Sequence, residues 1–382
     1  MSNQIGVCIR DSLVDALAMK GGTGEHSYAT NSHYQRSVFF EIQPMVTENV
    51  REMLVQVGFP GCIKVADLGC SSGENTFLAM SEIVNTIIQS YEQKGETQPE
   101  IDCCLNDLPE NDFNTTFRLV PSFLKKLKLE GSGKCFLSGV PNSFYSRLFP
   151  SKSLHFGFSS LSIHWLSKVP DGLENNTQSI HIKDPCPQNA YKSYLNQFKN
   201  DFSLFLRMRS EEIVPNGHAV LTFVGRKVSD PVYKDCFQVW SLLSDCLLDL
   251  VSEGVVKESE MESFNMPFYN PNEEEVREVI LKEGSFEISK IKTFDHVVPY
   301  KINSIEEEEE EDDEDKSLKL EAGKKQASWA RCITEPLLVA HFGDAIIEPV
   351  FDKYAHYMAK YLRASNHRPN MTLIIVVSLT KK

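Results

Sequence analysis

The sequence lacks the features that define several large classes of protein. No apolar run approaches the roughly 20 residues of a membrane-spanning helix, and the first residues lack the apolar stretch of a signal peptide. Basic residues are in the minority, 39 against 53 acidic ones, for a net charge of −14. Because such a surface repels phosphates, we expect neither a nucleic acid nor a membrane as a partner. These absences favour an enzyme of the cytoplasm.

The ten cysteines lack the spacing of a metal site. No Cys-x-x-Cys pair occurs, which argues against bound zinc. Cys103 and Cys104 lie in an apolar strand pattern, and Cys135, Cys236 and Cys246 also have apolar neighbours. Free cysteines in such surroundings behave as small buried hydrophobic residues of a reducing compartment.

Strand-like and helix-like segments alternate along residues 63–224, which predicts an α/β fold with a mostly parallel sheet. The predicted strands are 63–68, 101–106, 135–140, 154–160, 219–224, 286–292 and 371–379. The predicted helices are 34–57, 77–90, 113–126, 190–214, 237–253 and 273–283, with a helical region over 328–362. The acidic run Glu306–Asp315 predicts a disordered loop over 304–326.

These elements assemble into one predicted domain over residues 1–382. Its sheet comprises about 60–230 with 285–293 and 370–380. A helical cap, 237–284 and 328–362, is expected to lie over the carboxyl edge of the sheet, where open α/β sheets bind ligands.

The segment VADLGCSSGEN, residues 65–75, is the most informative motif. A buried strand turns on Gly69 and Gly73 and then enters a helix, so backbone N–H groups face a ligand at close range. The glycine spacing is neither that of a dinucleotide site nor that of a P-loop. It is typical of the first motif of S-adenosylmethionine (SAM) methyltransferases.

Five further segments extend this likeness over nearly the whole chain. They are MKGGTGEHSYATNSHYQ (19–35), LNDLPENDFN (105–114), SGVPNSFYSRLFP (138–150), SSLSIHWLSKVP (159–170) and FNMPFY (264–269). Together with the first motif, the chain resembles the plant SABATH methyltransferases, most of all those that methylate benzoate and salicylate. The resemblance implies a Rossmann-like, seven-stranded SAM-dependent fold, with SAM as cofactor and a small aromatic acid as substrate. Relatives are often homodimers.

The resemblance assigns a cofactor site to residues on four segments. Tyr28 closes over the cofactor, and Asp107 accepts from the ribose hydroxyls, as an acidic side chain after a second strand is suited to do. The other implied contacts are Asp67, Gly69, Cys70 and Asn75 to the methionine part, and Leu108, Ser143 and Phe144 to the adenine. Without the resemblance, Asp107 before Pro109 also fits a turn or helix-capping residue.

For the substrate, the resemblance assigns Gln35 and Trp165 as the two donors that hold the carboxylate. An indole is donor-only and offers an anion no competing acceptor. Lys20 lies beside the pocket segment, and Ser32 precedes Gln35 by one helical turn. The apolar wall is assigned to Val239, Trp240 and Phe268. From the residues alone, Trp165 also fits plain core packing.

The chain departs from the salicylate-type pattern at two positions. Leu161 replaces a frequent tyrosine, and His164 replaces the methionine of some members. Benzoate, salicylate, nicotinate and related acids therefore stay open. His164 fits contact with a substrate hydroxyl, ring nitrogen or carboxylate, and equally a histidine with a local partner. N- or O-methylation of a nicotinate- or xanthine-type ring, and a jasmonate-type acid, are the alternatives.

The implied chemistry is a methyl transfer that depends on positioning and has no catalytic acid or base. A carboxylic acid with a pKa of about 4 is ionised at neutral pH and is already the nucleophile. Some relatives are also described with magnesium, and the matching residues here are Asn176, Glu262, Phe264 and Asn265. Oxygen ligands suit that cation, and a salt-bridged loop is the simpler alternative.

Overall fold

The computed structural model describes residues 16–127, 134–174, 176, 179–182, 188–227, 234–297, 313–364 and 371–382. Within these ranges the chain forms one seven-stranded sheet with the order β3-β2-β1-β4-β5-β7-β6. The strands are β1 (Cys62–Leu68), β2 (Glu100–Asp107), β3 (Cys135–Pro141), β4 (Leu154–Ser160), β5 (Ile213–Gly225), β6 (Phe286–Val297) and β7 (Met371–Lys381). The first five are parallel, and β7 runs antiparallel to β5 and β6. The predicted fold class is confirmed.

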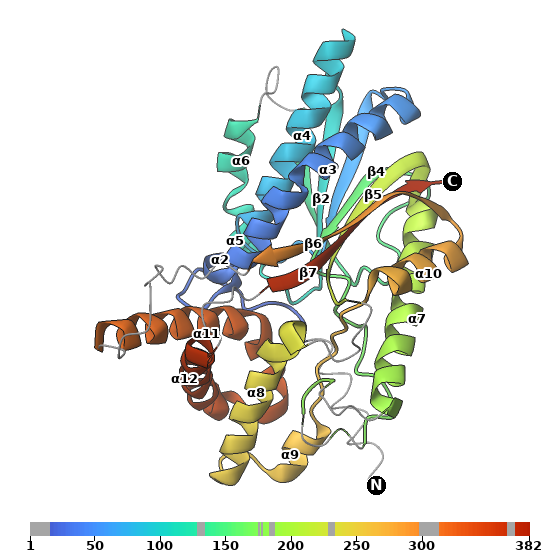
Figure 1. Ribbon diagram of the computed structural model, residues 1–382. Coiled ribbons are helices and arrows are strands. Elements are labelled where there is room, and N and C mark those ends of the chain that lie inside the picture. The colour runs from blue at the N-terminus through green and yellow to red at the C-terminus, as the bar shows by residue number, and fades with distance from the viewer. Residues whose placement is uncertain are drawn as a thin grey trace.

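Helices cover both faces of this sheet (Figure 1). On one face lie α3 (His33–Val57) and α4 (Asn75–Lys94), and on the other lie α7 (Gln188–Glu212) and α10 (Glu273–Glu283). The second half of β1 and the middle of β7 are buried without a break, because helices cover both faces of the sheet. Two apolar clusters result, and residues of both line the cavity of the site.

The remaining helices form a cap beside the sheet. Figure 1 shows α8 (Lys234–Ser252), α9 (Glu258–Ser263), α11 (Asp313–Phe342) and α12 (Ile347–Ala364) gathered in one body at one end of the sheet. A short 3₁₀ turn, Asp344–Ile346, joins α11 to α12. Residues of the cap and of the strand ends line one cavity, as predicted for a lid over the carboxyl edge. Among the described helices, none is both long and apolar enough to cross a bilayer.

The structure corrects several predicted boundaries. The strands β5 and β6 are longer than the predicted 219–224 and 286–292. The helix α11 begins at Asp313, so 313–326 is helical and not a disordered loop; residues 304–312 lie outside the described ranges. The helix predicted over 113–126 is two helices, α5 (Phe113–Phe117) and α6 (Val120–Lys126), with Pro121 in the first turn of the second. Gly343, with φ of +83°, interrupts the region 328–362. The long helix near 190–214 ends at Glu212, where β5 begins.

Candidate functional site

The predicted glycine turn after β1 is confirmed in detail. Gly69 has φ of +81°, and a Cβ there would lie 2.5 Å from Ser162. Only glycine fits both the backbone and the space. The N–H groups of Gly69 and Cys70 both donate to the carbonyl of Asn106 at 2.9 Å, which ties the turn to the end of β2.

Asp107 completes this turn from the neighbouring strand. Its carboxylate accepts from the backbone N–H of Ser71 at 2.7 Å and from that of Leu108 at 2.8 Å. Burial raises the pKa of Asp107 to about 6. Burial, with a smaller contribution from Asp107, raises the pKa of the nearby Asp67 to about 7. Two carboxylates therefore share a site without a partner cation among the described residues, which suits a positively charged ligand.

The N-terminal segment closes this side of the site. Tyr28 lies on the short helix α2 (Tyr28–Asn31), lines the cavity and is buried. Its backbone N–H donates to the Lys20 carbonyl at 2.9 Å. The helix packs so closely on the glycine turn that a Cβ on Gly73 would lie 2.9 Å from Ala29. Burial raises the pKa of Tyr28 far above the physiological range, so its hydroxyl stays protonated.

A buried ion pair shapes the loop predicted to hold the adenine. Arg209, at the end of α7, donates to the carbonyls of Phe144 and Ser146 at 2.8 and 2.7 Å. Glu212 pairs with Arg209 at 2.7 Å and accepts from the N–H of Leu148 at 2.6 Å. The end of α7 therefore sets the path of this loop beside the cavity.

The cavity itself has a volume of about 380 Å³ and unites most of the predicted site. It is lined by the predicted cofactor residues Tyr28, Gly69, Asp107, Leu108, Ser143 and Phe144. It is also lined by the predicted substrate residues Gln35, Leu161, His164, Trp165, Val239, Trp240 and Phe268. Residues from the N-terminal segment, the sheet and the cap, far apart in sequence, thus meet at one place.

Five of the residues predicted to bind the cofactor or the substrate are not among those that line the cavity. Asp67 and Cys70 are buried beneath the glycine turn. The Asn75 amide donates to the Ser32 carbonyl and hydroxyl at 3.1 and 2.8 Å, so these two residues join the turn to α3. Lys20 donates to Glu335 of the cap at 2.5 Å, which makes it a tether of the N-terminal segment rather than a free cation.

Two N–H donors at the substrate end of the cavity are without an acceptor among the described residues. They are Nε2 of Gln35 and Nε1 of Trp165; the only hydrogen bond of the Gln35 side chain in these ranges uses its oxygen. The backbone of Trp165 is fixed, because its carbonyl accepts from Tyr145 at 2.7 Å. Donors that are held in place and unpaired fit an anion.

His164 supplies a third donor, and its tautomer follows from its surroundings. Its Nδ1 faces the Val224 N–H at 3.2 Å and therefore acts as the acceptor. Burial lowers the pKa of His164 to about 3, so the ring is neutral and Nε2 carries the one proton. Among the described residues no group bonds to Nε2, so this histidine lines the cavity as an N–H donor.

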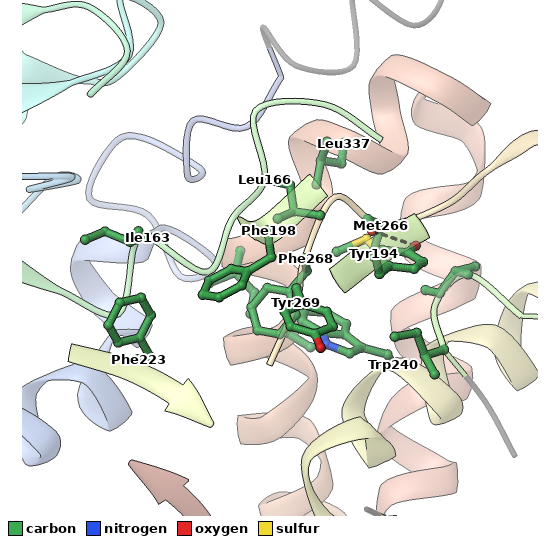
Figure 2. Packing of buried hydrophobic residues seen from close by; sticks show 14 of the residues in the cluster. Ile163, Leu166, Tyr194, Phe198, Phe223, Trp240, Met266, Phe268, Tyr269 and Leu337 are labelled. Atoms are coloured by element: carbon green, nitrogen blue, oxygen red, sulfur yellow. Dashed lines mark hydrogen bonds between the residues drawn. The ribbon is translucent and has the colours of Figure 1, made fainter. Parts of the chain in front are cut away.

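Aromatic rings form the wall around these donors. Figure 2 shows Trp240 and Phe268 together in the buried cluster, and their ring centroids are 5.2 Å apart. Trp165 stands edge-on to Phe268 at 5.0 Å. Leu161 completes the wall, and its backbone adopts the left-handed conformation, with φ of +55°. Such flat surfaces favour a planar ring.

Sequence reasoning missed the contribution of α11 to this cavity. Gln326, Trp329 and Ile333 line it from the cap, and Thr372 lines it from the start of β7. One signal was available: the chain has three tryptophans, and all three line the cavity. A rare residue type that is suited to ligand contact was informative here.

The predicted magnesium ligands do not form a cation site. The Asn176 amide nitrogen donates to Asn265 Oδ1 at 2.7 Å and to the Ser179 carbonyl at 3.0 Å. These oxygens therefore already bond to an N–H group of the protein. Phe264 is buried, but Glu262, the one charged member of the set, is exposed. Magnesium in proteins is usually bound through one or two carboxylates. Among the described residues, no group of three or more His, Cys, Asp and Glu is placed to bind a metal.

The order of the sheet, the glycine turn after β1 and the adjoining cavity with aromatic walls fit an α/β methyltransferase of the SAM-dependent class. The family model described as SAM dependent carboxyl methyltransferase matches residues 14–382, and the chain belongs to that family. It is a SAM-dependent carboxyl methyltransferase of the SABATH type, as the motifs predicted.

Named relatives support this assignment over the full length. The chain is 51% identical to a salicylate/benzoate carboxyl methyltransferase of Arabidopsis thaliana, over 97% of the chain and 94% of the relative. It is 40% identical to a benzoic acid/salicylic acid carboxyl methyltransferase of Petunia hybrida, over 97% and 99%. Among solved structures, loganic acid methyltransferase with S-adenosylhomocysteine (SAH) is 31% identical with a TM-score of 0.81, over 95% and 98%.

Proposed function

We propose that the protein methylates the carboxylate of a small aromatic acid of the benzoate or salicylate type. One observation carries the choice: Gln35 and Trp165 present unpaired N–H donors in a cavity with aromatic walls. Two donors match the two oxygens of a carboxylate. The relatives that carry salicylate and benzoate in their names support the same class.

The residues of the glycine turn fit the methyl donor. Gly69 and Asp107 both line the cavity, and an acidic side chain at the end of a second strand is suited to accept from a ribose diol. When bound, SAM supplies a methyl group on a sulfonium, which is a strong electrophile. The chain contributes Asp67 and Asp107, whose negative charge favours that cation.

The residues of the substrate end act by orientation. The acid is ionised near neutral pH, since its pKa is about 4, and it needs no base. Gln35 and Trp165 each hold one carboxylate oxygen, and a remaining lone pair then faces the methyl carbon. Displacement requires the oxygen about 3 Å from that carbon, in line with the bond that breaks. The products are the methyl ester and SAH.

The aromatic wall favours a ring over a flexible chain. Trp240 and Phe268 bound a planar space, while Leu161 offers no hydroxyl to a substituent. The neutral His164 presents only a donor to the acid. A donor directed at a ring nitrogen would engage the lone pair that N-methylation needs, so the site favours the oxygen acceptor. No step of the proposal passes through magnesium, because the predicted ligands do not fit the ion.

The test is an assay with radiolabelled SAM and a panel of benzoate, salicylate, nicotinate, xanthosine and jasmonate. We expect label in a product that mild base hydrolyses, with an aromatic acid ranked first by kcat/KM. Label that resists saponification, or preference for jasmonate, would overturn the proposal. In Trp165→Phe, loss of one charge-assisted hydrogen bond is expected to lower kcat/KM by about 10- to 100-fold.

A further inference from the structure

Trp329 makes a contact that none of the sequence motifs includes. It lies on α11 in the cap and lines the cavity. Its indole Nε1 donates to Oε1 of Gln35, on α3, at 3.4 Å. The cap and the core are thereby joined at the side chain that the proposed function uses for the carboxylate.

This contact selects one of the two orientations of the Gln35 amide. A glutamine amide presents an oxygen acceptor on one side and an NH₂ donor on the other. An indole N–H only donates, so it can bond to the amide oxygen but not to the NH₂ group. With Oε1 held by Trp329, Nε2 is directed away from the indole and is free for a ligand. The reversed amide would place two donors together and turn an acceptor toward the anion.

Trp329 is itself supported on several sides. Its ring stands edge-on to Tyr34 at 5.8 Å, and the Tyr34 hydroxyl is 2.6 Å from that of Thr372 on β7. The next turn of α11 is tied to the N-terminal segment, since Lys20 N–H donates to the Cys332 carbonyl at 2.9 Å. The indole therefore meets Gln35 from a fixed direction and not from a mobile side chain.

We propose that Trp329 is a positioning residue that sets the Gln35 amide for the substrate carboxylate. The inference rests on the proposed function and deepens it. It means that the carboxylate site is complete only when α11 is docked on α3. Trp329 then controls affinity for the acid through Gln35, and it leaves affinity for the cofactor unchanged.

The experiment is a double-mutant cycle of Trp329→Phe and Gln35→Met. The first change removes the N–H and keeps a ring, and the second keeps the length of the side chain without polar atoms. Loss of a neutral hydrogen bond predicts a KM for benzoate about 3- to 10-fold higher in Trp329→Phe, with kcat little changed. In the Gln35→Met background, adding Trp329→Phe should change KM by less than about twofold, because the amide is already gone.

Trp240→Phe is the matched control, since it removes another indole N–H from the same cavity. Its effect should multiply with that of Gln35→Met, because no contact joins the two side chains in the described structure. The Kd for SAH, measured by calorimetry, verifies that each variant is folded and should stay within about twofold. If Trp329→Phe fails to fold, Trp329→Met takes its place in the cycle.

The outcomes separate this inference from the proposed function. An unchanged KM in Trp329→Phe, or the same increase with and without Gln35, overturns the positioning role while the activity stands. If the unsubstituted protein esterifies no acid, the proposed function itself fails, and the inference fails with it. Coupling confined to the Trp329–Gln35 pair supports both.

Discussion

At the scale of single residues, Gly69 shows how strictly the cofactor turn is determined. Its positive φ and the 2.5 Å approach of Ser162 both exclude a side chain. We expect Gly69→Ala to cost about 1–3 kcal/mol of stability and to weaken SAH binding by more than tenfold. Gly95→Ala is the control, because Gly95 also has positive φ, +75°, but no neighbour within 4 Å. Equal SAH affinity in the two variants would contradict this account.

Lys20 illustrates a residue whose role the sequence did not reveal. Its position beside the pocket motif suggested contact with substrate, whereas its ammonium pairs with Glu335 of the cap. We expect Lys20→Met to raise the Kd for SAH by about 2- to 5-fold, through a loosened Tyr28 segment, with little change in KM for benzoate. Lys199→Met, which breaks the pair with Glu278 between α7 and α10, should change neither value. A selective rise in the KM for benzoate would instead support direct contact.

Residue identities in the site were predictable where a short motif contains the whole interaction. Gly69 and Asp107 were recognised at the ends of predicted strands and Trp165 from the family resemblance, and all three line the cavity. Trp329 was not predictable, because its partner Gln35 is 294 residues away in the chain. No local pattern encodes such a contact, which depends on how α11 packs against α3.

At the scale of elements, the end of α7 holds the loop of residues 144–149, which includes the predicted adenine contact Phe144. Arg209 and Glu212 are both buried, and together they bind four backbone groups of the loop that follows β3. Arg209→Met leaves the buried charge of Glu212 with the more distant Arg147, at 3.5 Å, as its remaining cationic partner, and we expect a loss of up to about 3–5 kcal/mol in urea unfolding. SAH binding should weaken in parallel.

The double variant Arg209→Met with Glu212→Gln separates charge from packing. Because it also removes the buried charge that has lost its main partner, it should recover part of the lost stability. A double variant that is less stable than Arg209→Met would contradict the electrostatic explanation.

The bounds of helices and strands with a clear apolar repeat were predicted closely. The bounds of elements that depend on tertiary contacts were not. The strand β4 and the helix α10 have their predicted bounds, since alternation and a capping box mark them locally. The start of α11 was mispredicted because it lies in the acidic run. A run of charged residues indicates exposure to solvent but does not distinguish a loop from a helix. The register of β6 and β7, and the placement of the cap, depend on packing that no single segment records.

At the scale of the whole molecule, two carboxyl groups of the site couple stability to pH. The pKa values of about 7 for Asp67 and about 6 for Asp107 lie above the values near 4 of the unfolded chain. Ionising these carboxyls in the folded protein therefore costs stability, and their contribution is lost as the pH rises from about 4 to 6–7. An ionised carboxylate accepts from a ribose diol better than a protonated one, so we expect SAH affinity to rise up to the same folded-state pKa values.

The increase in Tm that saturating SAH produces should therefore be larger at pH 8 than at pH 5.5. Comparing the protein with and without SAH at each pH removes the contribution of groups outside the site. His164 stays neutral throughout, because burial holds its pKa at about 3. An increase in Tm that is constant with pH would contradict the assignment of these carboxylates.

The proposed activity depends most on the N–H groups of Gln35 and Trp165, which bind the substrate carboxylate. A crystal structure of the protein with SAH and benzoate tests this directly. We predict one benzoate oxygen about 3 Å from Gln35 Nε2 and the other about 3 Å from Trp165 Nε1, with the ring against Trp240 and Phe268. A benzoate bound with its carboxylate away from both nitrogens would contradict the account.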